Sequence, residues 1–400
     1  MSASPSPAAP DRTDWIAVAA VISAGVLVSI QVGKLPPLLS QLRAEFDMGL
    51  VLGGLLASSF MLIGAAIGIL AGFASDRIGN RRALVLGVGI TAVGCVAGAL
   101  ATTTAMLLAA RLVEGLGFVL TVVGGPSLLT ALTRPDQRQL ALGFWSTYMP
   151  LGVTLGMLGA LAVDRLFDWR GLWIALGILL LGSAIAIRHL IRKAQPPVAP
   201  RRFQAAPLKR PGPWLLAACF ACYTTQWFAI VTWIPTYLRE GGVRDELWIA
   251  LGGALVVAIN VVGNTSSAAL MHRGVPRWLI IAAIPVVMGL LGVLSFGSQM
   301  PVTAKVAFAM AASGIGGMLP AAVLASVPVH AREPSEIATV NGVVTQLLNV
   351  GSFFGPPALA ALVARFGGWD DGRWLLLAAG LLGGALALLL RRVELRGTGA

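Results

Sequence analysis

The chain has 400 residues, of which 57% are hydrophobic and only 12% charged, and its mean hydropathy is +0.83. This composition is too apolar for a soluble enzyme or a disordered chain, and it indicates a membrane protein. A formal net charge of +12 is also typical of nucleic-acid-binding domains. Membrane topology explains the charge without a nucleic acid, as shown below.

Twelve segments are long and apolar enough to cross a bilayer, which takes about 20 residues in a helix. In the first half they span residues 15–34, 48–71, 83–101, 105–128, 139–162 and 171–190. In the second half they span 214–237, 247–270, 278–297, 302–328, 337–363 and 373–391. Glycines and a proline interrupt 302–328, which is tolerated where neighbouring helices cover the freed backbone. We therefore predict an all-α membrane protein of twelve transmembrane helices.

The basic residues indicate how the chain is oriented. If both termini are cytoplasmic, nineteen of the 29 Lys and Arg residues fall on the cytoplasmic side and nine on the outside. Such an excess is the pattern expected of cytoplasmic loops. Together with an Ala- and Arg-rich composition, it predicts a multi-pass protein of a bacterial inner membrane with both termini in the cytoplasm.

The chain divides near its midpoint. We predict a cytoplasmic tail (1–13), an N-terminal six-helix half (14–190), a basic Pro-rich cytoplasmic linker (191–213), a C-terminal six-helix half (214–392) and a second tail (393–400). Three glycines recur 199 residues further on: Gly143, Gly152 and Gly156 as Gly342, Gly351 and Gly355. Two similar halves predict a pseudo-two-fold repeat, as in one large class of transporters.

A charged motif follows the second span, reading Gly72-Phe-Ala-Ser-Asp-Arg-Ile-Gly-Asn-Arg-Arg82 and predicted as a short loop. It resembles the signature loop of the major facilitator superfamily, and the resemblance runs along the whole chain. It implies a twelve-helix secondary transporter in which this loop latches one conformation. By resemblance, the gating residues are Gly72, Asp76, Arg77, Gly79 and Arg81. An acid near a helix N-terminus and cations at opposing helix ends suit a breakable lock; the alternative is a solvated turn that fixes topology.

The fourth span carries Arg111 and Glu114 in a stretch that resembles the fourth-helix motif of the same family, with Glu114 where many members have Gln. The two residues are three apart and share a helix face. Charges inside a membrane are costly and face a cavity or a partner. One interpretation is a self-neutralising structural pair; the other is substrate binding by Arg111 and proton coupling through Glu114.

The first span ends with Gln31 and Lys34, one helical turn apart. Lys34 could extend to the outer membrane surface. Otherwise it places a cation at the outer mouth of a cavity, where Lys34 and Arg111 together would attract a carboxylate. This second interpretation predicts a small organic anion as the substrate.

Further polar and aromatic residues occur in the middle of the spans and are candidates for the wall of a central cavity. Besides Gln31, they are Trp145, Tyr148, Tyr223, Gln226, Trp227, Asn260, Asn264, Gln346 and Asn349. Each could instead form a hydrogen bond between helices. The three cysteines, all in apolar runs, are interpreted as packing residues.

These observations predict a secondary active transporter that moves a small organic anion by alternating access, with proton coupling or exchange for a counter-anion. Export of a lipophilic drug or metabolite is the alternative, although the fifth span lacks the Gly-Pro pair of drug antiporters. A non-transporting receptor is disfavoured because no sizeable soluble domain is present. With no phosphate loop, metal cluster or catalytic triad in context, we expect no enzyme activity, cofactor or metal. The expected partners are the substrate and the bilayer, with no nucleic acid, and a monomer is expected.

Overall fold

The computed structural model describes residues 12–162, 168–191, 204–297 and 299–397, and within these ranges the regular structure is helical. Side chains of residues 71–76 are outside this description. Most of the predicted N-terminal tail, residues 192–203 of the predicted linker and the last three residues also lie outside it.

In the first half the described α-helices form six crossings. They are α1 (Trp15–Gly33), α2 (Leu35–Glu45), α3 (Leu50–Ser58), α4 (Leu62–Ile78), α5 (Asn80–Ala99), α6 (Thr104–Leu132), α7 (Arg138–Trp145), α8 (Tyr148–Gly159) and α10 (Trp169–Leu190). The short 3-10 helix η1 (Ser59–Met61) joins α3 to α4.

The second half repeats this arrangement. Its helices are α11 (Pro211–Glu240), α12 (Glu246–Ala258), α13 (Asn260–His272), α14 (Arg277–Ser295), α15 (Val302–Gly316), α16 (Met318–Ser326), α17 (Ile337–Phe366), α18 (Trp369–Gly372) and α19 (Trp374–Gly397).

Eleven of these helices or helix pairs are long and apolar enough to cross a membrane in the described residues. The twelfth crossing is α7 with α8, which is interrupted at Ser146 and Thr147. The predicted all-helical, twelve-crossing architecture is therefore confirmed. The break in the tenth crossing, between α15 and α16, falls at Gly317, within the predicted glycine-rich interruption.

The predicted loop after the second span is wrong in its extent. Helix α4 continues to Ile78, so Gly72, Asp76 and Arg77 are helical, and only Gly79 lies between α4 and α5. The reason is local: no residue from Leu62 to Ile78 breaks a helix except tolerated glycines, whereas Gly79 has φ +90°, which ends α4 and is accessible to glycine at little cost.

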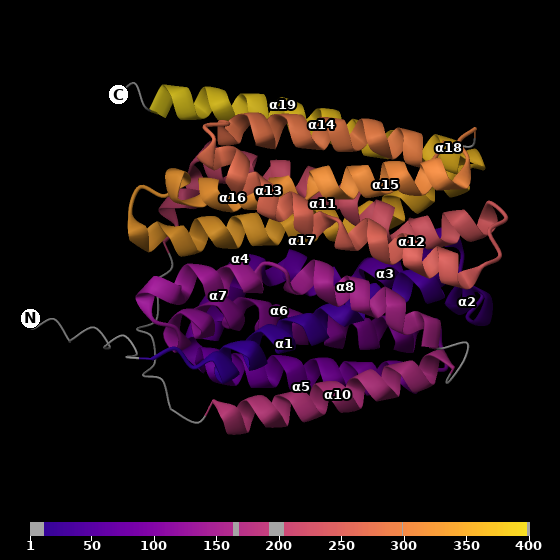
Figure 1. Cartoon of the computed structure of the whole chain (residues 1–400), viewed down its shortest axis with the longest axis horizontal. Helices are drawn as coiled ribbons and strands as arrows, with labels where there is room; N and C mark the ends of the chain where they lie inside the picture. The colour runs from indigo at the N-terminus through magenta and orange to yellow at the C-terminus, as the bar shows by residue number, and fades with distance from the viewer. Residues whose placement is uncertain (1–11, 163–167, 192–203, 298, 398–400) are drawn as a thin grey trace, which may run out of the picture.

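The two halves lie side by side as two layers of nearly parallel helices (Figure 1). Helix α1 begins and α19 ends at one end of the bundle, here called the termini end, while α2, α12 and α18 lie at the opposite, far end. Between the halves, α3 and α4 pack along α17, α2 packs against α11, and α8 packs against α12. Helices α2, α3, α8 and α12 all belong to the far end, so the halves are closed together there.

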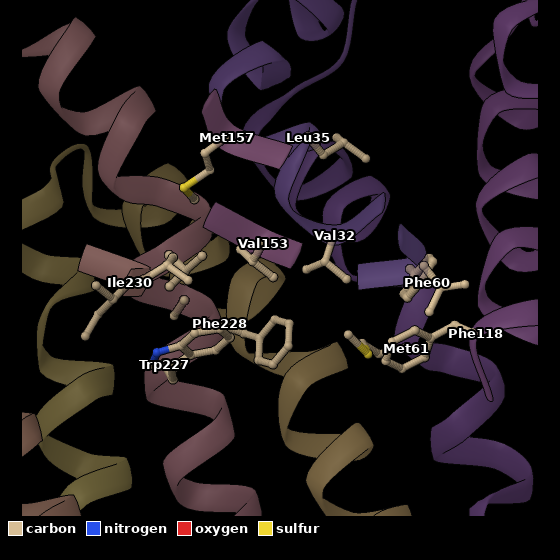
Figure 2. Packing of buried hydrophobic residues seen from close by; sticks show 14 of the residues in the cluster. Val32, Leu35, Phe60, Met61, Phe118, Val153, Met157, Trp227, Phe228 and Ile230 are labelled. Atoms are coloured by element: carbon tan, nitrogen blue, oxygen red, sulfur yellow. The ribbon is translucent and has the colours of Figure 1, made fainter. Parts of the chain in front are cut away.

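An apolar layer fills this closed contact. Figure 2 shows Val32, Met61 and Val153 of the first half gathered near Phe228 of α11. All four side chains are buried and belong to one hydrophobic cluster. Next to the layer, Met157 of α8 packs against Gly253 of α12. The described contact of the two halves is therefore apolar and buried at this layer.

Glycines bring α13 close to the break between α15 and α16. A Cβ atom on Gly263 would lie 1.9 Å from the carbonyl oxygen of Gly314, and one on Gly317 would lie 2.2 Å from that of Asn260. Backbone cannot move aside as a side chain can, so only glycine fits at either position.

We expect Gly263→Ala to destabilise the protein by about 1–3 kcal/mol, as overpacking usually does. The measurement is thermal unfolding of the purified protein in detergent. Gly89→Ala is the matched control, because a Cβ there meets no atom within 4 Å, and alanine favours a helix over glycine. Equal melting temperatures for the two variants would contradict the close packing.

Candidate functional site

A cluster of charged side chains lies inside the first half, where Lys34, Arg111 and Glu114 are all fully buried. Lys34 stands between α1 and α2, where Pro36 and Pro37 start a new helix. Arg111 and Glu114 lie one turn apart on α6. The break between α1 and α2 thus directs a cation toward the charged face of α6.

Glu114 binds both cations. Lys34 Nζ lies 2.8 Å from Glu114 Oε1, and Arg111 Nη1 donates to Glu114 Oε2. Arg111 Nη1 also donates to the carbonyl oxygen of Gln31 at 2.9 Å. Lys34 therefore does not extend to the membrane surface, and the carboxylate that Lys34 and Arg111 hold here is that of Glu114.

Three residues that sequence reasoning missed surround the cluster. The Lys34 ammonium donates to Cys95 Sγ at 3.3 Å and lies 3.9 Å from the centroid of the Trp173 ring. The Arg111 guanidinium lies over the ring of Phe60, 4.7 Å from its centroid. Ring faces attract cations, most strongly where water is excluded. Nothing in the local sequence of these residues signals their role, because each comes from a different crossing.

The cluster carries more positive than negative formal charge: two cations share one carboxylate. In addition, Arg111 Nε and Nη2 are buried and have no hydrogen-bond partner among the residues that the structure describes. A buried donor without a partner costs roughly 1–3 kcal/mol, and an uncompensated buried charge costs more. An anion beside Arg111 would balance the surplus positive charge and accept hydrogen bonds from the two unpartnered donors.

A second polar group lies in the second half and unites four of the predicted residues. Asn260 Nδ2 donates to Tyr223 Oη at 3.2 Å, and Asn264 Nδ2 donates to Asn260 Oδ1 at 3.1 Å. Trp227 Nε1 donates to Ser313 Oγ at 3.0 Å, and Asn260 also donates to the carbonyl of Ser313 at 2.8 Å. Ser313, on α15, is a member of this group that was not predicted.

Three other predicted residues lie apart from these two groups. Gln226 Nε2 donates to the carbonyl oxygens of Pro285 and Leu376 and so joins α11 to α14 and α19, as an interhelical hydrogen bond would. Gln346 Oε1 accepts a hydrogen bond from the backbone of Ile69 at 3.3 Å, across the contact of the two halves. Asn349 Nδ2 donates to a carbonyl within its own helix, α17.

Trp145 and Tyr148 lie on either side of the break between α7 and α8. Their rings stack with centroids 4.7 Å apart. The Trp145 ring packs against Gly25 of α1 and Gly125 of α6, where a Cβ would lie within 3.0 Å of it. These two residues form an aromatic wall of the first half, separate from the charged cluster.

The predicted gating residues can be placed only in part. Arg81 Nη2 donates to the carbonyl oxygen of Arg188 at 2.6 Å and thereby joins α5 to the end of α10. Arg77 is exposed. The Asp76 side chain and the surroundings of Gly72 lie outside the described part of the structure, so the gating role of both residues stays a prediction.

A family model for the Major Facilitator Superfamily matches residues 21–356. The chain belongs to the major facilitator superfamily. This family and its fold are of transporters, not enzymes, and the chain is a multi-pass membrane protein.

Similar proteins agree with this assignment. The chain is 27% identical over 379 residues to "Probable sulfoacetate transporter SauU" of Cupriavidus necator, with 86% of each chain covered. It is 23% identical over 310 residues to "Cyanate transport protein CynX" of Escherichia coli K12, covering 75% of this chain and 77% of the relative. Among solved structures, a bacterial homologue of the human lysosomal transporter Spinster in an inward-facing conformation matches with a TM-score of 0.78 and 18% identity, over 96% of this chain and 98% of that one.

Proposed function

We propose that this protein is a secondary active transporter that moves a small organic anion across the bacterial inner membrane. The observation that carries the proposal is the buried cluster of Lys34, Arg111 and Glu114, with its surplus positive charge and two unpartnered Arg111 donors. The names of two relatives support the same class, because sulfoacetate and cyanate are both small anions.

The 3-10 helix η1 lies between the charged cluster and the apolar layer that joins the halves, and we propose that the substrate reaches the cluster past it. Phe60 of η1 covers the Arg111 guanidinium, while its neighbour Met61 belongs to the apolar layer between the halves. Figure 2 shows Phe60 and Met61 side by side at this boundary. In this proposal η1 separates Arg111 from the substrate path. The group of Tyr223, Asn260 and Asn264 supplies polar contacts to the substrate from the opposite half.

Glu114 is the proposed site of proton coupling. Its carboxylate neutralises one of the two cations, so protonation of Glu114 would raise the formal charge of the cluster by one and free both cations for the substrate. An anion and a proton would then bind together, because opposite charges favour each other most where water is excluded. Exchange for a counter-anion is the variant of the proposal without a bound proton.

The excess of basic residues at the termini end supports an orientation with that end in the cytoplasm and the far end outside. With the far end closed, the described conformation is then closed to the outside. Alternating access requires this contact to open.

Uptake into proteoliposomes tests the proposal. The panel consists of radiolabelled small carboxylates and sulfonates, sulfoacetate among them, with and without an inward proton gradient. We expect saturable uptake of at least one acid, stimulated by the gradient. Uptake of no acid by folded protein would overturn the anion proposal in favour of drug export, and binding without counterflow would favour a receptor. Gradient-independent counterflow would point to exchange.

A further inference from the structure

Polar contacts join α2 to α11 at the far end, directly between the two halves. We propose that they form a latch, made of Ser40 and Arg43 on α2 and Arg239 and Glu240 on α11, which sets how often the far end opens. The proposal rests on alternating access between the halves, but it does not depend on which substrate is carried.

Arg239 is the centre of the latch. Its Nη1 donates to Ser40 Oγ at 3.0 Å, and its Nη2 donates to the carbonyl oxygen of Pro37 at 3.2 Å. Within its own half, Glu246 of α12 binds the same guanidinium through Nε at 2.9 Å and Nη2 at 2.5 Å. This bidentate ion pair fixes the plane of the guanidinium. Arg239 is therefore already oriented toward α2 before the two halves come into contact.

Glu240 forms the second crossing. Its Oε1 lies 3.6 Å from Arg43 Nη1 on α2. Its Oε2 accepts a hydrogen bond from Trp369 Nε1 of α18 at 2.9 Å, again within its own half. Arg239 and Glu240, which contact α2, are therefore each also bound by a residue of their own half, which moves together with α11. Such an arrangement suits a contact that breaks and re-forms without reorganising either half.

The latch is suited to reversible opening because its groups are only partly buried. Side chains of Arg43 and Arg239 are 20% and 26% exposed, and those of Glu240 and Glu246 are 46% and 45% exposed. Exposed ion pairs contribute little each, and water replaces their partners when they separate. The side chains of Val32, Val153 and Phe228 in the apolar layer are buried. The latch, by contrast, adds a small preference for the closed state and orients the two halves.

Maleimide labelling of a single introduced cysteine tests the latch. Met157→Cys places a thiol in the fully buried contact of α8 with α12, and the native Cys95, Cys219 and Cys222 are buried. In protein reconstituted in nanodiscs, Arg239→Ala in this background should increase the rate of labelling at position 157 roughly 3–10-fold, the effect of losing hydrogen bonds of this kind. No substrate is needed, so this result is independent of the anion proposal.

The matched control is Arg170→Ala. Arg170 pairs with Glu45 at 2.6 Å at the same end of the bundle, with 35% exposure on both sides, but both residues belong to the first half. Its removal should leave labelling unchanged. Arg43→Glu should increase labelling, and Arg43→Glu combined with Glu240→Arg should restore it to within about twofold of the parent.

Equal labelling of the parent and Arg239→Ala, with melting temperatures that show both to be folded, would overturn the latch. So would an equal increase in Arg170→Ala, because general loosening of the far end would then explain both. A swap that fails to restore the parent rate would remove Arg43 and Glu240 from the proposal.

Discussion

Replacing Glu114 with glutamine is expected to abolish uptake and to lower thermal stability more than any other single change in the charged cluster. Glutamine has nearly the same shape but no charge, so Lys34 and Arg111 would remain buried without a carboxylate. Breaking a buried ion pair by removing one partner costs about 3–5 kcal/mol. Thermal unfolding in detergent and uptake into proteoliposomes measure the two effects.

Glu45→Gln is the control for this prediction. Glu45 also binds an arginine and a tryptophan, Arg170 and Trp169, but at the far end, where Arg170 and Glu45 are each 35% exposed. Water can replace a partner there, and we expect a loss below about 1 kcal/mol. If Glu114→Gln melted at the same temperature as Glu45→Gln, the ion pairs of the cluster would not have the cost of breaking expected for a buried site.

The sequence predicted the elements of the fold far better than their contacts. Twelve crossings follow from hydropathy because each helix must bury its own backbone groups in the bilayer, and this requirement is local. The interruption of the fifth crossing at Ser146 and Thr147 was not predicted, although Pro150 signals it, because a proline has no N–H to bond the carbonyl of the residue four positions earlier, here Ser146. What the sequence did not predict is the packing at the break, where the Trp145 ring lies against Gly25 and Gly125.

The candidate site shows the same limit. Arg111 and Glu114 were paired from sequence because helical periodicity places residues three apart on one face. Lys34 was predicted as a cation near Arg111, but its bond to Glu114 joins residues 80 apart in the chain. Periodicity also could not tell which face of α11 points inward: Tyr223 and Trp227 join the polar group, whereas Gln226 bonds to α14 and α19. Such choices depend on packing, which a single sequence does not contain.

Lys34→Met is the prediction that separates a structural cluster from a functional one. Methionine is unbranched and apolar, so it can occupy the space beside Trp173 and Cys95. Glu114 and Arg111 would remain as a neutral pair, and the surplus positive charge would be gone. We therefore expect a melting temperature equal to that of the parent or higher, since replacing buried charges by apolar groups is often stabilising.

Anion uptake by Lys34→Met should nevertheless fall at least tenfold, because a buried hydrogen bond to a charged group contributes roughly 1.5–3 kcal/mol. Lys305→Met is the control: Lys305 is also a buried lysine beside an aromatic ring, Tyr237, but it belongs to the second half, away from the cluster. We expect its uptake to match the parent. A Lys34→Met variant that is stable and transports the anion normally would show that the cluster only stabilises the first half. A stable variant that has lost uptake would show that the surplus positive charge of the cluster destabilises the fold and serves substrate binding.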